Sequence, residues 1–433
     1  MTQFSEREKN RRSFLKYLAA SAVLAPSIKS ALAASAAELP AIPDDPFTFW
    51  PHDPNFAVER PEDAIDVFEL EATAYKKVPV AHFAYMETGA DSGDTVRANR
   101  QDIGKFGLRS RRLRDVRKVD ASVDILKTKY NWPFFFCPVG GPAAQHADGF
   151  MGAARAAGRH NVAQMMSTGT KETVAQANKE RNGTPVIFQL YINQNWEVTK
   201  NLVQNAERDG ARAVAITIDL PSTFKRTQYE RAKRRDSRLC GTCHEIADPK
   251  FPKGSVARRV GSTGPSQLFA EAMTEQAKAY KEPPLTLTWD SMKRIRDITK
   301  MDVMLKGVMH PQDAETCVKE GFGIMVSNHG GRNEDTTAST ISALPDIVAV
   351  ANGKVPVFID GGFRRGMDIV KALAMGADMV GFGRPWLWGL GAFGEAGVDR
   401  VIQIMQAEII AAMQQVGAAN IKELTPDLVY RSL

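Results

Sequence analysis

The chain has 433 residues, of which 43% are hydrophobic and 24% charged, and its formal net charge is +6. This is the composition of a soluble globular protein, and the length allows one large domain or two ordinary ones. The charge is modest and no nucleic-acid-binding motif occurs, so nucleic acid is not an expected partner. A basic surface instead favours an anionic substrate or acidic partners.

The first 40 residues have the features of an export signal. Asn10-Arg-Arg-Ser-Phe-Leu-Lys16 opens an apolar run too short to span a membrane, and Ala31-Leu-Ala33 offers small residues for cleavage. The segment resembles a twin-arginine signal, which directs folded proteins across a bacterial membrane. We therefore expect a signal over residues 1–33, an extended arm over 34–60 and a periplasmic protein. A basic amino-terminal tail is the alternative.

From Pro61 to Ala90 the apolar spacing is helical, and Gly89 is expected to end the second of two helices. Eight apolar strand-like runs then alternate with helix-like patterns. The runs are Phe134–Val139, Val162–Met166, Val186–Leu190, Ala213–Ile218, Val303–Leu305, Ile324–Val326, Val357–Ile359 and Met379–Phe382. The helix-like patterns include Thr173–Lys179, Thr199–Arg208, Pro311–Glu320 and Gly366–Met375.

Eight strands alternating with helices over about 250 residues predict an α/β protein with a closed (β/α)8 TIM barrel. An open doubly wound sheet is the alternative. The interval from Asp219 to Val303 is too long for one loop and a helix, so we expect a lid insert at about residues 222–288, between the fourth and fifth strands. The barrel domain, with its amino-terminal helices, is expected to occupy residues 61–430.

Polar residues follow the predicted strands. The carboxyl ends of parallel strands meet at one face, where ligands bind in such barrels. Ser327-Asn-His-Gly-Gly-Arg332 ends the sixth strand. His329 can accept a proton near neutral pH, and Arg332 offers two parallel donors to a carboxylate. This combination suits abstraction of a proton near a substrate carboxylate.

The seventh and eighth strands end in a predicted phosphate site. Gly361, Gly362 and Gly383 leave backbone N–H groups accessible, and Arg364 and Arg384 add charge-assisted hydrogen bonds. Ser167, Gln189 and Thr217 suit the edge of a flat ring, and Lys306 can stabilise negative charge on it. Flavin mononucleotide (FMN) fits these requirements, whereas the Gly-x-Gly-x-x-Gly turn of a dinucleotide site does not occur.

The motifs Gln189-Leu-Tyr191, Ser327–Arg332 and Asp360-Gly-Gly-Phe-Arg-Arg-Gly366 resemble those of the FMN-dependent α-hydroxy-acid oxidase and dehydrogenase family over roughly residues 60–425. That family includes glycolate oxidase, flavin L-lactate dehydrogenase and mandelate dehydrogenase. The resemblance implies a catalytic set and a cofactor set. The catalytic set is His329 as base, Asp219 behind it, Tyr191 as donor, Arg332 and Arg226 on the substrate carboxylate, and Lys306 at the flavin. The cofactor set is Val139, Gly140, Ser167, Gln189, Thr217, Lys306, Ser327, Asp360, Gly361, Arg364, Gly383 and Arg384.

The implied reaction is oxidation of an L-2-hydroxy acid, lactate-like or bulkier, to the 2-oxo acid. The expected acceptor is a quinone or cytochrome, with O₂ and peroxide formation as the alternative. The resemblance also implies a homo-oligomer, in particular a tetramer. A non-catalytic binding protein or a non-redox, phosphate-binding barrel of isomerase type remains a further alternative.

Two positions depart from the family pattern. A substrate-binding Tyr of the amino-terminal helices is matched by Phe83, and we expect Tyr85 to face another way on the helix. A bulky Trp is matched by Gly169, which favours a larger or differently bound substrate.

Cys240-Gly-Thr-Cys243-His244, within the predicted lid, has the spacing of a covalent haem c site. A surface disulfide or a metal clip is the interpretation that we favour, because a haem needs an apolar pocket.

Overall fold

The computed structural model describes residues 53–193, 195–220, 225–235 and 287–431. The predicted signal, most of the predicted arm and lid, and the Cys240–His244 motif lie outside these residues. Within them, no helix combines the length and the apolar character needed to cross a membrane.

Eight parallel strands close into a barrel in chain order, and the last strand pairs with the first. The predicted (β/α)8 barrel is therefore confirmed, and the open sheet was the wrong alternative. The strands coincide with the predicted runs apart from their end residues. They are β4 (Phe134–Phe136), β5 (Ala163–Ser167), β6 (Ile187–Leu190), β7 (Ala213–Thr217), β8 (Asp302–Val308), β9 (Gly323–Val326), β10 (Val357–Ile359) and β11 (Met379–Phe382).

The strands are buried on both faces, which explains their continuous apolar sequences. Side chains alternate between the barrel interior and the helix layer. In β4, Phe135 belongs to the interior cluster, whereas Phe134 and Phe136 pack in the outer core. Phe358 of β10 also points inward, and its ring centroid lies 5.4 Å from that of Phe135. The barrel is therefore a packed core, and only its rim is available for a ligand.

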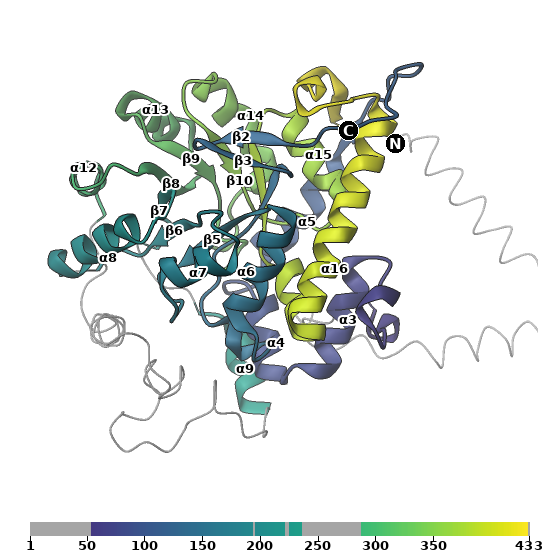
Figure 1. Cartoon of the computed structure of the whole chain (residues 1–433), viewed down its shortest axis with the longest axis horizontal. Coiled ribbons are helices and arrows are strands. Elements are labelled where there is room, and N and C mark those ends of the chain that lie inside the picture. Colours follow the sequence, from purple (N-terminus) through teal and green to yellow (C-terminus); the bar gives the residue numbers. More distant parts are fainter. Residues whose placement is uncertain (1–52, 194, 221–224, 236–286, 432–433) are drawn as a thin grey trace, which may run out of the picture. The chain divides into compact units, whose positions relative to one another are not determined.

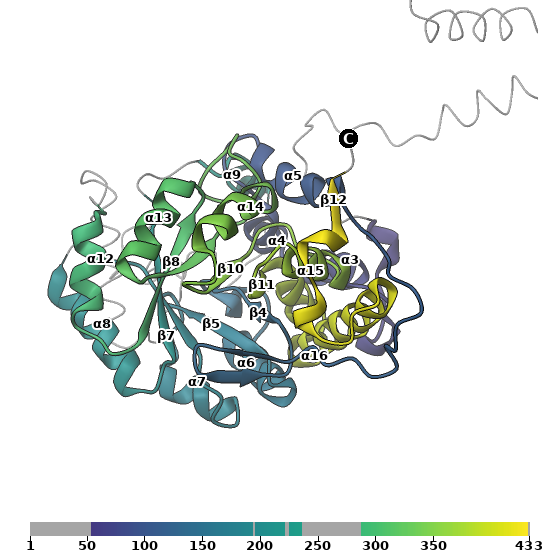
Figure 2. The same cartoon turned by 90° about the horizontal axis from the view of Figure 1, so that it is seen from above.

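Helices surround the strands (Figure 2). They are α6 (Gly149–His160), α7 (Val174–Glu180), α8 (Trp196–Arg208), α9 (Thr227–Arg235), α12 (Trp289–Arg296), α13 (Pro311–Glu320), α14 (Thr340–Ala351), α15 (Gly366–Ala374) and α16 (Arg384–Val416). The helices predicted at 173–179, 199–208, 311–320 and 366–375 are confirmed as α7, α8, α13 and α15, with small shifts at their ends.

Smaller elements complete the fold. The strand β1 (Phe106–Leu108) pairs with β12 (Val429–Arg431), and β2 (Val123–Ile125) pairs with β3 (Thr128–Tyr130). Leu126 and Tyr130 of the second pair join the interior cluster. The 3₁₀ helices are Pro54–Phe56, Pro61–Asp63, Asp102–Lys105, Pro142–Ala144, Ile421–Glu423 and Pro426–Leu428.

The amino-terminal helices attach to the barrel through α16. The helix α3 (Val67–Lys77) begins at Asp66, whose carboxylate accepts hydrogen bonds from the backbone N–H groups of Phe68 and Glu69. Figure 1 shows α3 beside the long helix α16. Arg365 binds Asp66 at 2.6 Å and Glu408 of α16 at 2.9 Å, so one side chain ties both helices to the loop after β10.

The next two helices, α4 (Val80–Glu87) and α5 (Asp94–Gln101), pack against the loop after β9. The predicted end of a helix near Gly89 is confirmed, whereas α5 was not predicted. Asn99 of α5 and Asn328 exchange two amide hydrogen bonds of 2.8 and 2.9 Å. The amino-terminal segment thereby fixes the loop that carries the predicted base.

Candidate active site

His329 lies in the loop after β9, where its ring meets the carboxylate of Asp219 from the end of β7. The Nδ1 atom of His329 lies 2.9 Å from Asp219 Oδ1 and 3.2 Å from Oδ2. An ionised carboxylate only accepts hydrogen bonds, so Nδ1 carries the proton and Nε2 has a free lone pair. This pairing confirms the predicted proximity of the two residues.

The electrostatics keep His329 neutral and Asp219 ionised. Burial lowers the pKa of His329, and the charge of Lys306 lowers it further. Burial opposes ionisation of Asp219, but electrostatic attraction to His329 and Lys306 and the hydrogen bond from His329 outweigh it, so the pKa of Asp219 is lowered. His329 is therefore unprotonated at Nε2 at neutral pH and can act as a base.

The backbone of this loop is left-handed over three successive residues, with φ of 56° at His329, 65° at Gly330 and 74° at Gly331. A side chain at position 331 would lie 2.6 Å from the backbone nitrogen of Val96. The carbonyl of Gly331 accepts a hydrogen bond of 2.9 Å from the N–H of Ala90. The close packing on the α4–α5 segment explains the Gly-Gly pair, and a non-glycine residue at positive φ is common at functional sites.

Lys306, near the carboxyl end of β8, belongs to a buried polar network at one side of the pocket. Its ammonium group lies 3.2 Å from Ser327 Oγ and 3.9 Å from Asp360 Oδ2. Ser327 donates to Asp360 Oδ1 at 2.6 Å, and the thiol of Cys137 lies 3.5 Å from Oδ2. The network holds the Lys306 ammonium group in place at the wall of the pocket.

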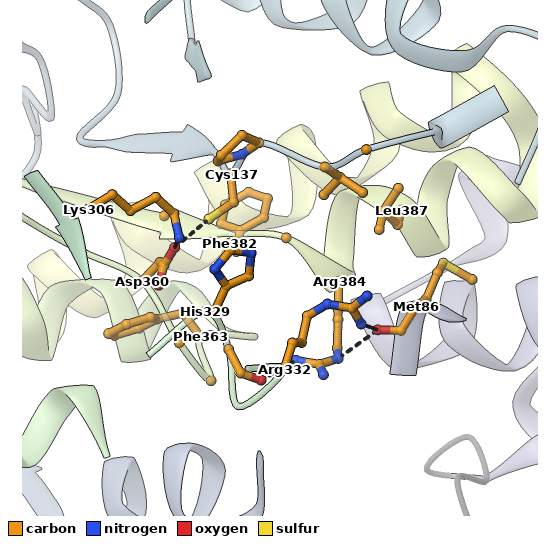
Figure 3. Close-up of a pocket in the computed structure, with 18 of the residues that line it drawn as sticks. Met86, Cys137, Lys306, His329, Arg332, Asp360, Phe363, Phe382, Arg384 and Leu387 are labelled. Atoms are coloured by element: carbon orange, nitrogen blue, oxygen red, sulfur yellow. Dashed lines mark hydrogen bonds and ion pairs between the residues drawn. The ribbon is translucent and has the colours of Figure 1, made fainter. Parts of the chain in front are cut away.

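Arg332 and Arg226 meet at the opposite side, and Figure 3 shows His329 between the Lys306–Asp360 pair and Arg332. Arg332 Nη1 donates to the carbonyls of Tyr85 at 2.7 Å and of Met86 at 3.2 Å. The guanidinium carbons of Arg332 and Arg226 lie 4.8 and 5.7 Å from the centroid of the Tyr85 ring. Burial and the charge of Arg226 lower the pKa of Arg332 to about 9, so these two cations favour an anion beside them.

The position of Tyr85 differs from the prediction for the amino-terminal helices, which placed the substrate-binding position of the family at Phe83. Tyr85 lines the pocket, whereas Phe83 packs on Tyr75 with ring centroids 5.2 Å apart. The two side chains do face different ways, as expected, but Tyr85 is the one that faces the pocket. In the structure α4 is buried on several sides, and its last turn reaches the pocket. The charges of Arg332 and Arg226 outweigh burial and lower the pKa of the Tyr85 hydroxyl.

Tyr191, which follows β6, completes the group around the base. Its hydroxyl lies 3.4 Å from His329 Nε2, and the two rings are stacked with centroids 6.5 Å apart. Burial raises the pKa of Tyr191 to about 12, so its hydroxyl remains a hydrogen-bond donor. The predicted catalytic residues His329, Asp219, Tyr191, Arg332, Arg226 and Lys306 are thus assembled at one end of the barrel.

The pocket that these residues enclose has about 820 Å³ of empty space, its open mouth included. Of the predicted cofactor residues, Val139, Gly140, Lys306, Asp360, Gly361, Arg364, Gly383 and Arg384 line it. Ser167, Gln189, Thr217 and Ser327 are buried at the neighbouring strand ends. Met86, Cys137, Phe363 and Leu387 also line the pocket and were not predicted, because nothing in their local sequence distinguishes them from core residues.

The residues present fit FMN. Gln189 donates to Thr217 Oγ1 at 2.8 Å, while its own Oε1 atom is buried without a hydrogen-bond partner and can accept from a ring N–H. The glycines after β10 and β11 and the side chains of Arg364 and Arg384 line the same pocket and would hold the phosphate of FMN. In the part of the chain that the structure describes, His, Cys, Asp and Glu form no group of three or more suited to a metal ion.

Residues 74–431 match the FMN-dependent dehydrogenase family. Among similar proteins, an L-lactate oxidase of Nostoc sp. is 32% identical over 370 residues, which cover 84% of this chain and 98% of that protein. Human 2-hydroxyacid oxidase 1 is 33% identical over 375 residues, covering 85% of this chain and 97% of that protein.

Two solved structures have the same fold. A mandelate oxidase is 28% identical with a TM-score of 0.73, and the match covers 86% of this chain and 99% of that one. The flavin-binding domain of baker's yeast flavocytochrome b2 is also 28% identical with a TM-score of 0.73, covering 86% and 88% of the two chains. The extent of these matches, together with the assembled site, leads to one conclusion: this chain belongs to the FMN-dependent dehydrogenase family and is a flavin-dependent oxidoreductase of the 2-hydroxy-acid oxidase and dehydrogenase type.

Proposed function

We propose that this protein oxidises an L-2-hydroxy acid, lactate-like or bulkier, to the corresponding 2-oxo acid. One observation carries the proposal: the unprotonated nitrogen of a neutral, carboxylate-bound His329 faces the same pocket as the guanidiniums of Arg332 and Arg226. A base and a carboxylate anchor at the two sides of one cavity suit removal of a proton from a bound hydroxy acid.

Each residue has a distinct task in this proposal. Arg332 and Arg226 bind the substrate carboxylate, and Tyr191 donates a hydrogen bond to the substrate oxygen. His329 Nε2 accepts the proton that leaves the substrate, and Asp219 stabilises the imidazolium that forms. FMN, when bound, accepts the two electrons that the substrate loses.

The space at Gly169 supports a substrate side chain larger than that of glycolate. At position 169 a Cβ atom would meet only Ser167 Oγ and Gly140 Cα, at 3.5 and 3.6 Å, so no bulky side chain from this position narrows the site. Flavin reduction by glycolate, lactate and mandelate compares these sizes directly. A kcat/KM for glycolate equal to that for mandelate contradicts the larger site.

Anaerobic flavin reduction tests the proposed reaction itself. The purified protein is mixed with a panel of L-2-hydroxy acids and their D-enantiomers without oxygen, and the flavin absorbance is recorded. We expect bleaching by at least one L-acid and none by its D-enantiomer. Absence of bleaching by every 2-hydroxy acid at high concentration contradicts the proposal.

For the electron acceptor we propose a quinone or cytochrome, in line with the periplasmic location that we also propose. Similarity to flavocytochrome b2 supports a cytochrome. The second candidate is O₂, because similar proteins are oxidases. To distinguish these candidates, the reduced flavin is mixed with O₂, a soluble quinone or cytochrome c, and the rate of reoxidation is measured for each. A peroxide assay accompanies the reaction with O₂.

We further propose export by the twin-arginine route and assembly into a homo-oligomer such as a tetramer, on the basis of the arginine-containing amino terminus and the family resemblance. Cell fractionation with and without a twin-arginine translocase tests the first, and light scattering tests the second. An absorbance spectrum in the Soret region decides whether Cys240 and Cys243 carry a haem.

A further inference from the structure

Glu87, the last residue of α4, has a buried carboxylate that the proposed reaction does not use. Its Oε1 atom accepts a hydrogen bond of 2.5 Å from Trp388 Nε1, and its Oε2 atom lies 3.5 Å from Arg384 Nε. The carboxyl end of a helix disfavours a negative charge. The buried carboxylate of Glu87 is therefore stabilised by Trp388 and Arg384 and not by the helix dipole.

Glu87 influences both arginines at the phosphate end of the pocket. It pairs with Arg384 directly. It also fixes the indole of Trp388, whose ring centroid lies 5.0 Å from the guanidinium carbon of Arg364.

The two guanidiniums also donate hydrogen bonds to neutral carbonyl groups. Arg384 donates to the carbonyls of Met86, Glu87 and Gly330 at 3.1 to 3.2 Å, and Arg364 donates to its neighbour Phe363. Carbonyl dipoles offset a buried charge less completely than a counter-ion does.

The pKa shifts agree with this picture. Burial and the charge of Arg384 lower the pKa of Arg364 to about 10, and burial lowers that of Arg384. Glu87 and Glu71 of α3 act in the opposite direction on both arginines. The protein itself therefore places two carboxylates near the two guanidiniums of the phosphate end.

We propose that Glu87 is a built-in counter-ion of the phosphate-binding arginines, and that its charge limits the preference of the pocket for FMN over riboflavin. The carboxylate stabilises the buried guanidiniums while no phosphate is present. When a phosphate binds, it becomes the counter-ion of the two guanidiniums. The carboxylate of Glu87 is still present and repels the phosphate. Removing the charge of Glu87 therefore strengthens binding of the phosphorylated flavin specifically.

Competition between the two flavins tests this inference without turnover, so the result does not depend on which acid is oxidised. Full-length wild-type protein and Glu87→Gln are dialysed to equilibrium against equimolar FMN and riboflavin, and the bound flavins are released and separated. Glutamine retains an oxygen that accepts from Trp388 Nε1. We expect the bound FMN-to-riboflavin ratio to rise about five- to tenfold in Glu87→Gln.

Glu408→Gln is the matched control, because Glu408 pairs at 2.9 Å with Arg365, an arginine of the same loop that does not line the pocket. Its flavin ratio should equal that of the wild type. If Glu87→Gln does not fold, Glu71→Gln removes the other carboxylate charge and should raise the ratio to a smaller extent. An unchanged or lower ratio in a folded Glu87→Gln protein overturns the inference, because Glu87 would then only position Arg384.

Discussion

His329 Nδ1 and Asp219 Oδ1 lie 2.9 Å apart, although the two residues are 110 positions apart in the chain and follow different strands, β9 and β7. The contact orients the imidazole and determines which nitrogen carries the proton. The chemistry that we propose depends on it, because the opposite tautomer would present an N–H to the substrate in place of a lone pair.

Asp219→Asn should leave the fold intact and slow flavin reduction by about 10²–10⁴-fold. The amide can donate to Nδ1 and stabilise the unproductive tautomer, and it cannot stabilise the imidazolium. Anaerobic stopped-flow absorbance measures the effect. Asp302→Asn, at the other end of the barrel, is the control and should retain the wild-type rate. A wild-type rate in Asp219→Asn would exclude a role for this carboxylate.

The dependence of flavin reduction on pH follows from the lowered pKa of His329. The base acts in its neutral form, which predominates above its pKa, and burial together with Lys306 places that pKa below the ordinary value. We expect kcat/KM to be maintained through pH 6.5 and to fall only at lower pH. In Asp219→Asn the residual activity should persist to still lower pH, since the charge of Asp219 raises the pKa of His329. A wild-type profile that falls with a midpoint above 6.5 contradicts this.

Tyr85→Phe should raise KM for the hydroxy acid about tenfold with little change in kcat. Phenylalanine keeps the ring beside Arg332 and Arg226 but removes the hydroxyl that these cations favour. Tyr75→Phe removes a hydroxyl from the neighbouring helix α3 outside the pocket and serves as the control. Equal effects of the two substitutions would show that the Tyr85 hydroxyl does not contact the substrate.

Arg332→Lys should raise KM at least tenfold, although the charge is conserved. The guanidinium binds the end of α4 through Nη1 and still has other N–H groups for the substrate, which a lysine ammonium cannot reproduce in the same geometry. Steady-state kinetics measures the change. A KM within twofold of the wild type would show that charge alone binds the carboxylate.

Gly331→Ala should destabilise the protein by roughly 1–3 kcal/mol and slow flavin reduction. The residue has φ of 74°, and the added methyl group would collide with the backbone of Val96. Gly353→Ala is a matched control, since Gly353 has φ of 69° but no atom within 4 Å of the added carbon. Thermal unfolding of the two variants separates backbone strain from the collision. Equal destabilisation would mean that packing on α5 contributes nothing.

The amino-acid sequence by itself determined the barrel and most of its site. Buried parallel strands have continuous apolar runs, and the polar residues that follow them must meet at one face once the strands align. Both are local properties, and they sufficed to place His329, Arg332, Lys306 and Asp360 together.

The tertiary structure alone decided which amino-terminal residues complete the site. Arg332 binds the carbonyl of Tyr85 across 247 positions of sequence, and Glu87 reaches Arg384 across a similar interval. The helical pattern of α4 indicated a helix but not which part of it meets the barrel. The part of α4 that faces the barrel depends on how α3, α4 and α5 pack against α16 and the loop after β9. These contacts join segments that are far apart in the sequence, so the local pattern of α4 does not reveal them.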